Sequence, residues 1–225
     1  MKQSASDLDV LTRDSWSIIS MEDAFSKALL TAEAIQRFKE ALSPAVMAPV
    51  MKLQNSPLGF RTDKSYSEEV VKENLICALI NGLMPCGNHF NIIAGRMYIT
   101  KEGFTFLLRK AGVPYSIDYS VPKTLAQGNG AIVSATIHYT LNDKPEKKQM
   151  DIPVKLNAGM GVDAALGKAD RKAKCWLYNH IMNTSLSDAD VDSHEPVRDV
   201  PSSQGRLALS PKPVVEVSDD DQLPM

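Results

Sequence analysis

Apolar residues recur every three or four positions through the first third of the chain, a spacing that predicts helices. The repeats cover 21–30, 32–42, 44–54 and 67–83. Each begins at or just after a residue type that favours a helix N-terminus, namely Ser20, Thr31, Ser43 and Ser67. Pro49 lies inside the third segment and should bend or end it. The fourth carries a core stripe at helical spacing, made of Val71, Leu75, Ala78, Leu79 and Leu83.

After residue 83 the apolar pattern changes to the alternation that is typical of strands. Residues 90–100 predict a hairpin that turns at Ala94-Gly95. Thr100 should cap a short helix that Gly112 ends. Three further strands are expected at 113–121, 131–141 and 147–156, followed by a long helix over 163–181. We therefore expect an α+β fold with a helical N-terminal part, an antiparallel β-meander in a β-β-β-α core, and the long helix laid across it.

Beyond residue 182 the sequence becomes rich in Pro, Ser and Asp and loses its periodicity. Such composition is typical of disordered segments. Three regions follow from this change and from the turn-forming residues before Ser67. They are a helical region at 1–66, an α+β core at 67–183 and a disordered acidic tail at 184–225.

The net charge of −2 over 225 residues conceals three blocks of different sign. Residues 1–89 carry a net −2, residues 90–182 a net +6 and residues 183–225 a net −6. A basic central block attracts polyanions, whereas the other interpretation is an ordinary lysine-rich surface. No run of 18 apolar residues predicts a membrane span, and the polar start does not resemble a secretion signal. Three cysteines at unrelated spacings favour a reducing, cytoplasmic location.

Within the long helix, positions counted at 100° per residue separate into two faces. One face is cationic and contains Lys168, Arg171, Lys172, Cys175 and Asn179. The opposite face contains Leu166, Ala169, Ala173, Trp176, Leu177 and His180. We expect the second face to pack on the sheet, with Trp176 in the core rather than stacking on a ligand, and the first face to lie outside.

More cations occur near this helix in sequence: Arg96, Lys101, Arg109, Lys110, Lys144, Lys147, Lys148 and Lys155. If the sheet and the helix border a groove, these side chains would neutralise phosphates in it without reading sequence. Four tyrosines, Tyr98, Tyr115, Tyr119 and Tyr139, either stack on bases or pack across strands. The sequence leaves both roles open.

No catalytic motif stands out along the chain. Both common glycine-rich phosphate loops are absent, so we expect no nucleotide cofactor. Cys86 and His89 are too few for a zinc site, which needs about four ligands, so we expect no metal. A catalytic acid–base pair that only the fold assembles remains an open alternative.

Two stretches resemble a known family. NGLMPCGNHFNIIAGRMYITKEGFTFLLRKAGV is similar to a helix, Leu-x-Pro turn, hairpin and short helix of RecT-type phage annealing proteins. DAALGKADRKAKCWLYNHI resembles the basic C-terminal helix of the wider RecT/Red-beta superfamily. The resemblance covers about residues 68–185.

This resemblance implies a non-enzymatic protein that binds single-stranded DNA, anneals complementary strands without ATP during recombination and repair, and holds the annealed duplex. It also implies a homo-oligomeric ring or filament, located in the bacterial cytoplasm if the protein is encoded by a bacteriophage. The implied DNA contacts are Lys168, Arg171, Lys172, Lys174, Arg96, Lys101, Arg109 and Lys110, to which we add the nearby Lys147 and Lys148.

The last residues, SDDDQLPM, resemble the acidic tip of bacterial single-stranded-DNA-binding proteins. That resemblance implies docking to host repair proteins through Asp219, Asp220, Asp221, Leu223, Pro224 and Met225. The alternative is a solubilising tail. For the whole chain two rival functions remain: a DNA-protecting protein that does not anneal, and a small enzyme.

Overall fold

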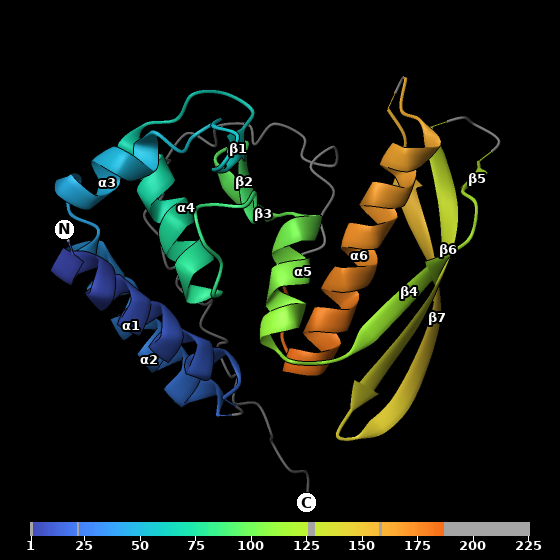
Figure 1. Cartoon of the computed structure of the whole chain (residues 1–225), viewed down its shortest axis with the longest axis horizontal. Helices are drawn as coiled ribbons and strands as arrows, with labels where there is room; N and C mark the ends of the chain where they lie inside the picture. The colour runs from blue at the N-terminus through green and yellow to red at the C-terminus, as the bar shows by residue number, and fades with distance from the viewer. Residues whose placement is uncertain (1, 22, 126–128, 158, 187–225) are drawn as a thin grey trace, which may run out of the picture. The chain divides into compact units, whose positions relative to one another are not determined.

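A computed structural model describes residues 2–21, 23–125, 129–157 and 159–186 (Figure 1). The chain divides into a unit of Met1–Glu195 and a unit of Pro196–Met225, and all described residues belong to the first. Within them the fold is mixed α+β, with six helices and two sheets. This confirms the predicted class. None of the described helices is both long and apolar enough to span a membrane.

The first three helices are α1 (Lys2–Ile19), α2 (Ala24–Ala41) and α3 (Pro44–Met51). The sequence pattern had divided α2 into two helices at Thr31, and that prediction is wrong. Thr31 lies in mid-helix, where its hydroxyl donates to the Lys27 carbonyl at 2.7 Å. A threonine satisfied in this way needs no helix end, so it marks a boundary only ambiguously.

The start of α2 also differs in detail from the prediction. Asp23, rather than Ser20, is its N-cap, and the carboxylate accepts the backbone N–H of Ser26 at 2.6 Å. Hydrogen bonds from the side chain and then the backbone of Ser26 lower the pKa of Asp23. Both residue types suit an N-cap, so the sequence alone allowed either position.

Helix α4 (Glu68–Ile80) packs beside a small sheet of β1 (Arg61–Thr62), β2 (Phe90–Ile93) and β3 (Arg96–Ile99). The predicted turn between β2 and β3 is confirmed, because Ala94 and Gly95 both have positive φ angles. Two positive φ angles in a two-residue loop match the twist of a hairpin. β1 joins the sheet in parallel with β2, so the boundary expected near residue 66 falls inside one compact unit.

Helix α5 (Lys101–Lys110) begins as predicted, because the Thr100 hydroxyl accepts the backbone N–H of Gly103 at 3.0 Å. Gly103 is required by packing as well. A Cβ atom at this position would lie 2.0 Å from the His89 carbonyl oxygen. The helix therefore lies against the loop before β2 at a distance that only glycine permits.

We predict that Gly103→Ala lowers the free energy of unfolding by about 1–3 kcal/mol, despite the better helix propensity of alanine. Gly167→Ala is the matched control, because beyond the adjoining residues and backbone of its own helix no heavy atom lies within 4 Å of the position that its added methyl group would occupy, and its φ is ordinary. There the substitution should raise the free energy of unfolding by about 0.5–1 kcal/mol. Urea denaturation measures both, and equal effects would contradict the close contact.

The second sheet contains β4 (Tyr115–Tyr119), β5 (Lys123–Thr124), β6 (Gly130–Leu141) and β7 (Lys144–Lys155). β4 and β5 both pair with one side of β6, and β7 pairs with the other side along its whole length. All pairs are antiparallel. Alternate residues of β6, from Ala131 to Tyr139, are buried, while His138 is exposed. One face of this sheet is therefore covered and the other is open.

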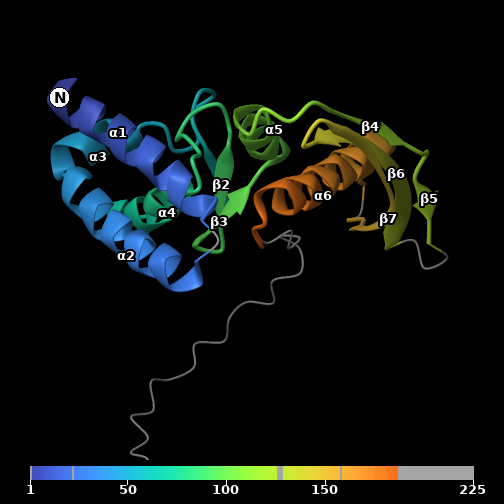
Figure 2. The same cartoon turned by 90° about the horizontal axis from the view of Figure 1, so that it is seen from below.

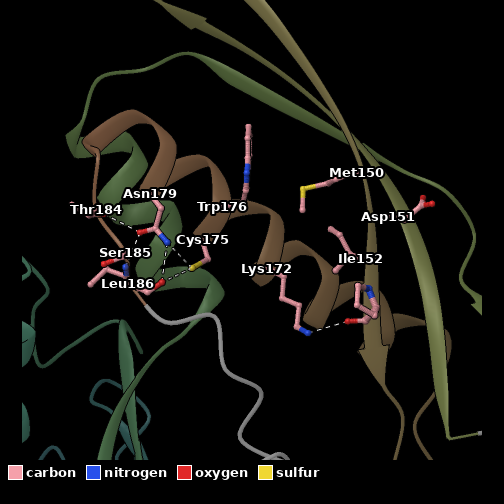
Figure 3. A pocket seen from close by; sticks show the side chains of 11 residues that line it. Met150, Asp151, Ile152, Lys172, Cys175, Trp176, Asn179, Thr184, Ser185 and Leu186 are labelled. Carbon is pink, nitrogen blue, oxygen red and sulfur yellow. Dashed lines mark hydrogen bonds between the residues drawn. The ribbon is translucent and has the colours of Figure 1, made fainter. Parts of the chain in front are cut away.

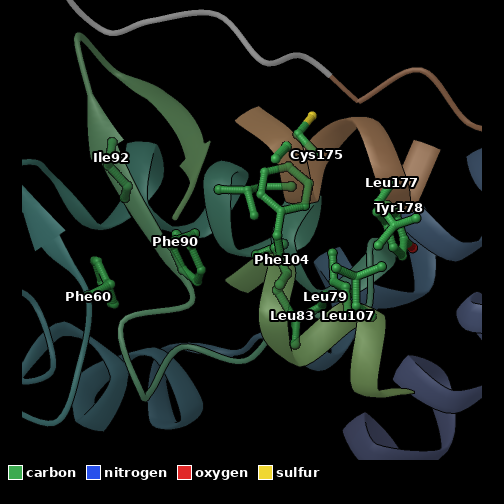
Figure 4. Close-up of a cluster of buried hydrophobic side chains, with 14 of the residues drawn as sticks. Phe60, Leu79, Leu83, Phe90, Ile92, Phe104, Leu107, Cys175, Leu177 and Tyr178 are labelled. Carbon is green, nitrogen blue, oxygen red and sulfur yellow. The ribbon is translucent and has the colours of Figure 1, made fainter. Parts of the chain in front are cut away.

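Helix α6 (Val162–Met182) covers that face, with α5 on its other side (Figures 1 and 2). Ala169, Ala173 and Leu177 are buried on the side of the sheet. On the side of α5, the Tyr178 ring lies 6.3 Å from Phe104. Figure 4 shows this part of the core, where side chains of α4, α5 and α6 meet. Two sides of α6 are thus buried, and only its flanks reach solvent.

Candidate nucleic-acid interface

The burial of α6 on two sides corrects one predicted contact. Arg171, expected on an outer cationic face, is only 3% exposed. Its guanidinium carbon lies 4.4 Å from the centroid of the Tyr98 ring on β3. A planar cation over an aromatic face is a stabilising arrangement inside a protein. The expectation of an outward Arg171 was wrong, because the helical count assumed one buried face.

Two other predicted contacts lie away from α6. The Lys110 ammonium lies 4.2 Å over the Trp16 ring of α1, and partial burial lowers the pKa of this lysine. Arg96 is exposed at the first position of β3. Neither residue lines the cavities described below. The ten predicted cations therefore do not form one continuous surface.

Three of these cations, Lys148, Lys168 and Lys172, lie along or beside one flank of α6. There a groove of about 390 Å³ runs between α6 and residues 150–153 of β7, with residues 184–186 at one end (Figure 3). We call it the α6–β7 groove. On α6 it is lined by Lys172, Cys175, Trp176 and Asn179. These side chains recur at helical spacing along one flank. Cys175, which was expected on the outer face, is only 1% exposed, so that expectation was wrong for it as well.

Two lysines of α6 reach across to β7. Lys172 donates to the Pro153 carbonyl at 2.9 Å, and Lys168 donates to the Lys155 carbonyl at 3.1 Å. They lie one helical turn apart, about 6 Å along the axis. The two hydrogen bonds hold both ammonium groups against the edge of β7. The flank therefore carries a lysine ammonium group at each of two successive turns of α6.

The acceptors on β7 are edge carbonyls. Leu156 donates its backbone N–H to Asn129, on the side of β6. Because alternate residues of an antiparallel strand face opposite sides, Pro153 and Lys155 direct their carbonyls away from β6. Proline at position 153 also removes an N–H from this edge, which limits pairing with another strand. The ammonium groups of Lys168 and Lys172 thus occupy carbonyls at the outer edge of β7, where Pro153 already removes one N–H donor.

Lys148 joins the groove through Trp176. Its ammonium lies 5.7 Å from the indole centroid, while His180 stacks on the same indole at 5.1 Å and an interplanar angle of 10°. Trp176 is half-buried, and the Tyr139 ring meets it edge-on at 6.3 Å. The predicted core role of Trp176 therefore holds only in part. The indole is partly covered by the sheet and partly reaches the groove.

Lys147 and Lys148 are separated by the alternation of β7. Lys148 pairs with Ile137, which is fully buried under α6, whereas Lys147 pairs with the exposed His138. Lys147 therefore projects from the open face of the sheet. Adjacent strand residues point to opposite faces, so these two predicted contacts do not serve one surface.

The other flank of α6 borders a second cavity, of about 370 Å³, which we call the α5–α6 cavity. It brings together three of the predicted cations, Lys101, Arg109 and Lys174. Lys174 binds the Asp170 carboxylate at 2.8 Å, and the Tyr119 hydroxyl donates to the same carboxylate at 2.8 Å. Burial, followed by this hydrogen bond, raises the pKa of Tyr119 well above its ordinary value.

His89 and Phe106 form one wall of this cavity, with their rings stacked at 4.3 Å. The Met84 backbone N–H donates to His89 Nδ1 at 3.3 Å, which places the proton of the neutral ring on Nε2. Burial lowers the pKa of His89, and the charge of Glu102 opposes that effect. His89 is therefore neutral near pH 7.

Sequence reasoning missed Asp170 and Phe106 as site residues, and it considered Tyr119 only for base stacking or for packing across strands. The spacing of Asp170 and Lys174, four apart in a helix, is the one local signal that was available. Tyr119 lies 51 positions before its partner, so only the fold relates them. The described residues contain no cluster of three or more metal-binding side chains.

The predicted tail contacts at 219–221 and 223–225 lie outside the described residues. Comparison with known protein families, with curated protein sequences and with solved structures found no match for this chain.

Proposed function

We propose that this protein binds single-stranded DNA along the α6–β7 groove and anneals complementary strands without ATP, as an annealing protein of phage-type recombination. The antiparallel sheet and α6 would correspond to the β-meander and basic helix of the predicted core. One observation carries the proposal. Lys168 and Lys172 place ammonium groups at successive turns of the same flank, and Lys148 continues the row beside Trp176.

The chemistry of the groove suits a polynucleotide backbone. Lysine contacts to phosphates release counterions and are indifferent to sequence. The half-buried Trp176 and the exposed His180 offer aromatic surface at one end of the row, where a base can stack. Annealing requires phosphates to be held while the base edges stay accessible for pairing, and it requires no catalytic residue.

Annealing itself is tested with two complementary oligonucleotides, one carrying a fluorophore and the other a quencher, in the absence of ATP. We expect the protein to quench the fluorescence faster than spontaneous pairing does, with the acceleration declining as salt is raised. Binding without acceleration would contradict annealing and would favour the rival, a DNA-protecting protein. Electron micrographs of the same mixtures test the proposed ring or filament.

One observation favours the second rival, a small enzyme. The α5–α6 cavity brings His89 to the same site as Glu102 and Asp170, and a neutral imidazole near carboxylates can transfer protons. Under the annealing proposal these groups have no catalytic task. Glu102→Gln should then leave the annealing rate unchanged. Loss of annealing in a folded Glu102→Gln variant would contradict the claim that these groups have no task in annealing.

Docking to host repair proteins through Asp219–Asp221 and Leu223–Met225 remains part of the proposal as a prediction from the sequence alone. The proposed location is the bacterial cytoplasm, where such partners and DNA substrates occur together.

A further inference from the structure

The α5–α6 cavity contains more recognition chemistry than the proposed DNA path uses. Lys101, Thr105 and Arg109 line it from one stripe of α5, since they are spaced four residues apart. Asp170 and Lys174 line it from the flank of α6 opposite to the one that borders the α6–β7 groove. The two sites therefore lie on different sides of one helix.

The lysines and carboxylates of this cavity have partners of opposite charge, whereas Arg109 has none among the described residues. Glu102 lies 3.8 Å from Lys101, and the two oxygens of Asp170 are engaged by Tyr119 and Lys174. Among the described residues Arg109 makes no ion pair, and its side chain is exposed. Because both carboxylates already have cationic neighbours, the net positive charge of the cavity centres on Arg109. A guanidinium fork matches the oxygens of a phosphate better than an ammonium does.

The cavity also has an apolar wall that suits a planar group. This wall is formed by the stacked rings of His89 and Phe106. The neutral His89 offers no charge of its own, so this wall suits an uncharged ring. One ring nitrogen is engaged by the Met84 N–H at 3.3 Å, and the ring lies against Phe106. The imidazole is therefore oriented by a hydrogen bond on its edge and a stacking contact on its face.

We propose that the α5–α6 cavity binds a 5′-phosphorylated nucleotide, with the phosphate monoester at Arg109 and Lys101 and the base against Phe106. A phosphate monoester carries about −1.5 to −2 charges near pH 7, more than a backbone diester, so the guanidinium of Arg109 attracts it more strongly. Two sources share this chemistry, a free mononucleotide and the 5′ end of a DNA strand. The site does not depend on the α6–β7 groove binding DNA.

Thymidine 5′-monophosphate, thymidine and inorganic phosphate are the probes, titrated separately into the full-length protein by calorimetry. We expect the monophosphate to bind at least about tenfold more tightly than either of the others, because each of them lacks half of the ligand. Equal affinity for thymidine and its monophosphate would overturn the phosphate part of the proposal. Absence of monophosphate binding, together with equal affinities for 5′-phosphorylated and 5′-hydroxyl oligothymidylate, would overturn the site.

Two variants separate the halves of the cavity. Arg109→Ala should weaken binding of both the monophosphate and inorganic phosphate by about tenfold. Phe106→Leu keeps apolar bulk but removes the aromatic ring on which a base can stack. It should weaken binding of the monophosphate by about fivefold and leave binding of inorganic phosphate unchanged. Arg37→Ala, an exposed arginine of α2, is the matched control and should change nothing. Unaltered binding in both cavity variants would reject the assignment.

The source of the nucleotide is decided by a third comparison, between 5′-phosphorylated and 5′-hydroxyl oligothymidylate. A preference for the phosphorylated strand that Arg109→Ala abolishes identifies the strand end as a ligand. Monophosphate binding without such a preference identifies the free nucleotide. The Lys168→Ala, Lys172→Ala double variant should retain monophosphate binding. The test of the α5–α6 cavity therefore stays valid even if the α6–β7 groove does not bind DNA.

Discussion

The double variant Lys168→Ala, Lys172→Ala is expected to bind single-stranded DNA more weakly and with a shallower dependence on salt. Each phosphate contact to a single strand contributes about 0.7 to the slope of log affinity against log salt concentration. Loss of two contacts should therefore reduce the magnitude of that slope by about 1.4. Fluorescence anisotropy of a labelled oligothymidylate over a salt series measures both quantities.

The matched control for this variant is Lys39→Ala, Lys52→Ala, which removes two exposed lysines of the N-terminal helical part. It changes the net charge equally but leaves the α6–β7 groove untouched. A general effect of protein charge would alter both double variants alike, whereas a groove should distinguish them. Equal salt slopes in the two variants, both folded, would reject the α6–β7 groove as the DNA path.

Arg171→Ala is expected to reduce stability rather than DNA contact. The substitution removes a buried guanidinium that lies over Tyr98 and leaves a cavity between α6 and β3. We expect the free energy of unfolding to fall by about 2–4 kcal/mol. Lys168→Ala, which removes a half-buried lysine and its hydrogen bond to the Lys155 carbonyl, should lower it by no more than about 1 kcal/mol. Urea denaturation followed by circular dichroism gives both values.

Arg171→Lys tests the reason for that loss. Lysine keeps the charge but lacks the planar group that stacks on an aromatic ring, so it should restore only part of the stability. A double-mutant cycle with Tyr98→Leu isolates the contact itself. If Arg171→Ala left stability unchanged and instead reduced the DNA salt slope, then Arg171 would be a phosphate contact on an outer face, as its sequence position first suggested.

Local signals in the sequence were enough for most elements of the fold. The Thr100 cap, the Ala94-Gly95 turn and the alternation of Tyr115, Ile117 and Tyr119 each depend on residues a few positions apart. Their physics is equally local: a hydroxyl that satisfies a nearby N–H, a backbone that accepts positive φ, and side chains that alternate across a strand. Thr31 shows the limit, because a threonine also fits inside a helix when its hydroxyl bonds the preceding turn.

The candidate sites depended on contacts that no local pattern contains. Helical periodicity gives the angle of each side chain of α6, but not the number of surfaces that pack against the helix. Because the sheet and α5 enclose it from two sides, Arg171 is buried while Lys168 and Lys172 remain on a flank. The α5–α6 cavity likewise joins His89, Arg109 and Asp170 from separate parts of the chain. The sequence by itself determined most of the elements and their order, although not helix α1 or the short strands β1 and β5. The tertiary structure decided which cations share a surface, since that depends on the packing of elements distant in sequence.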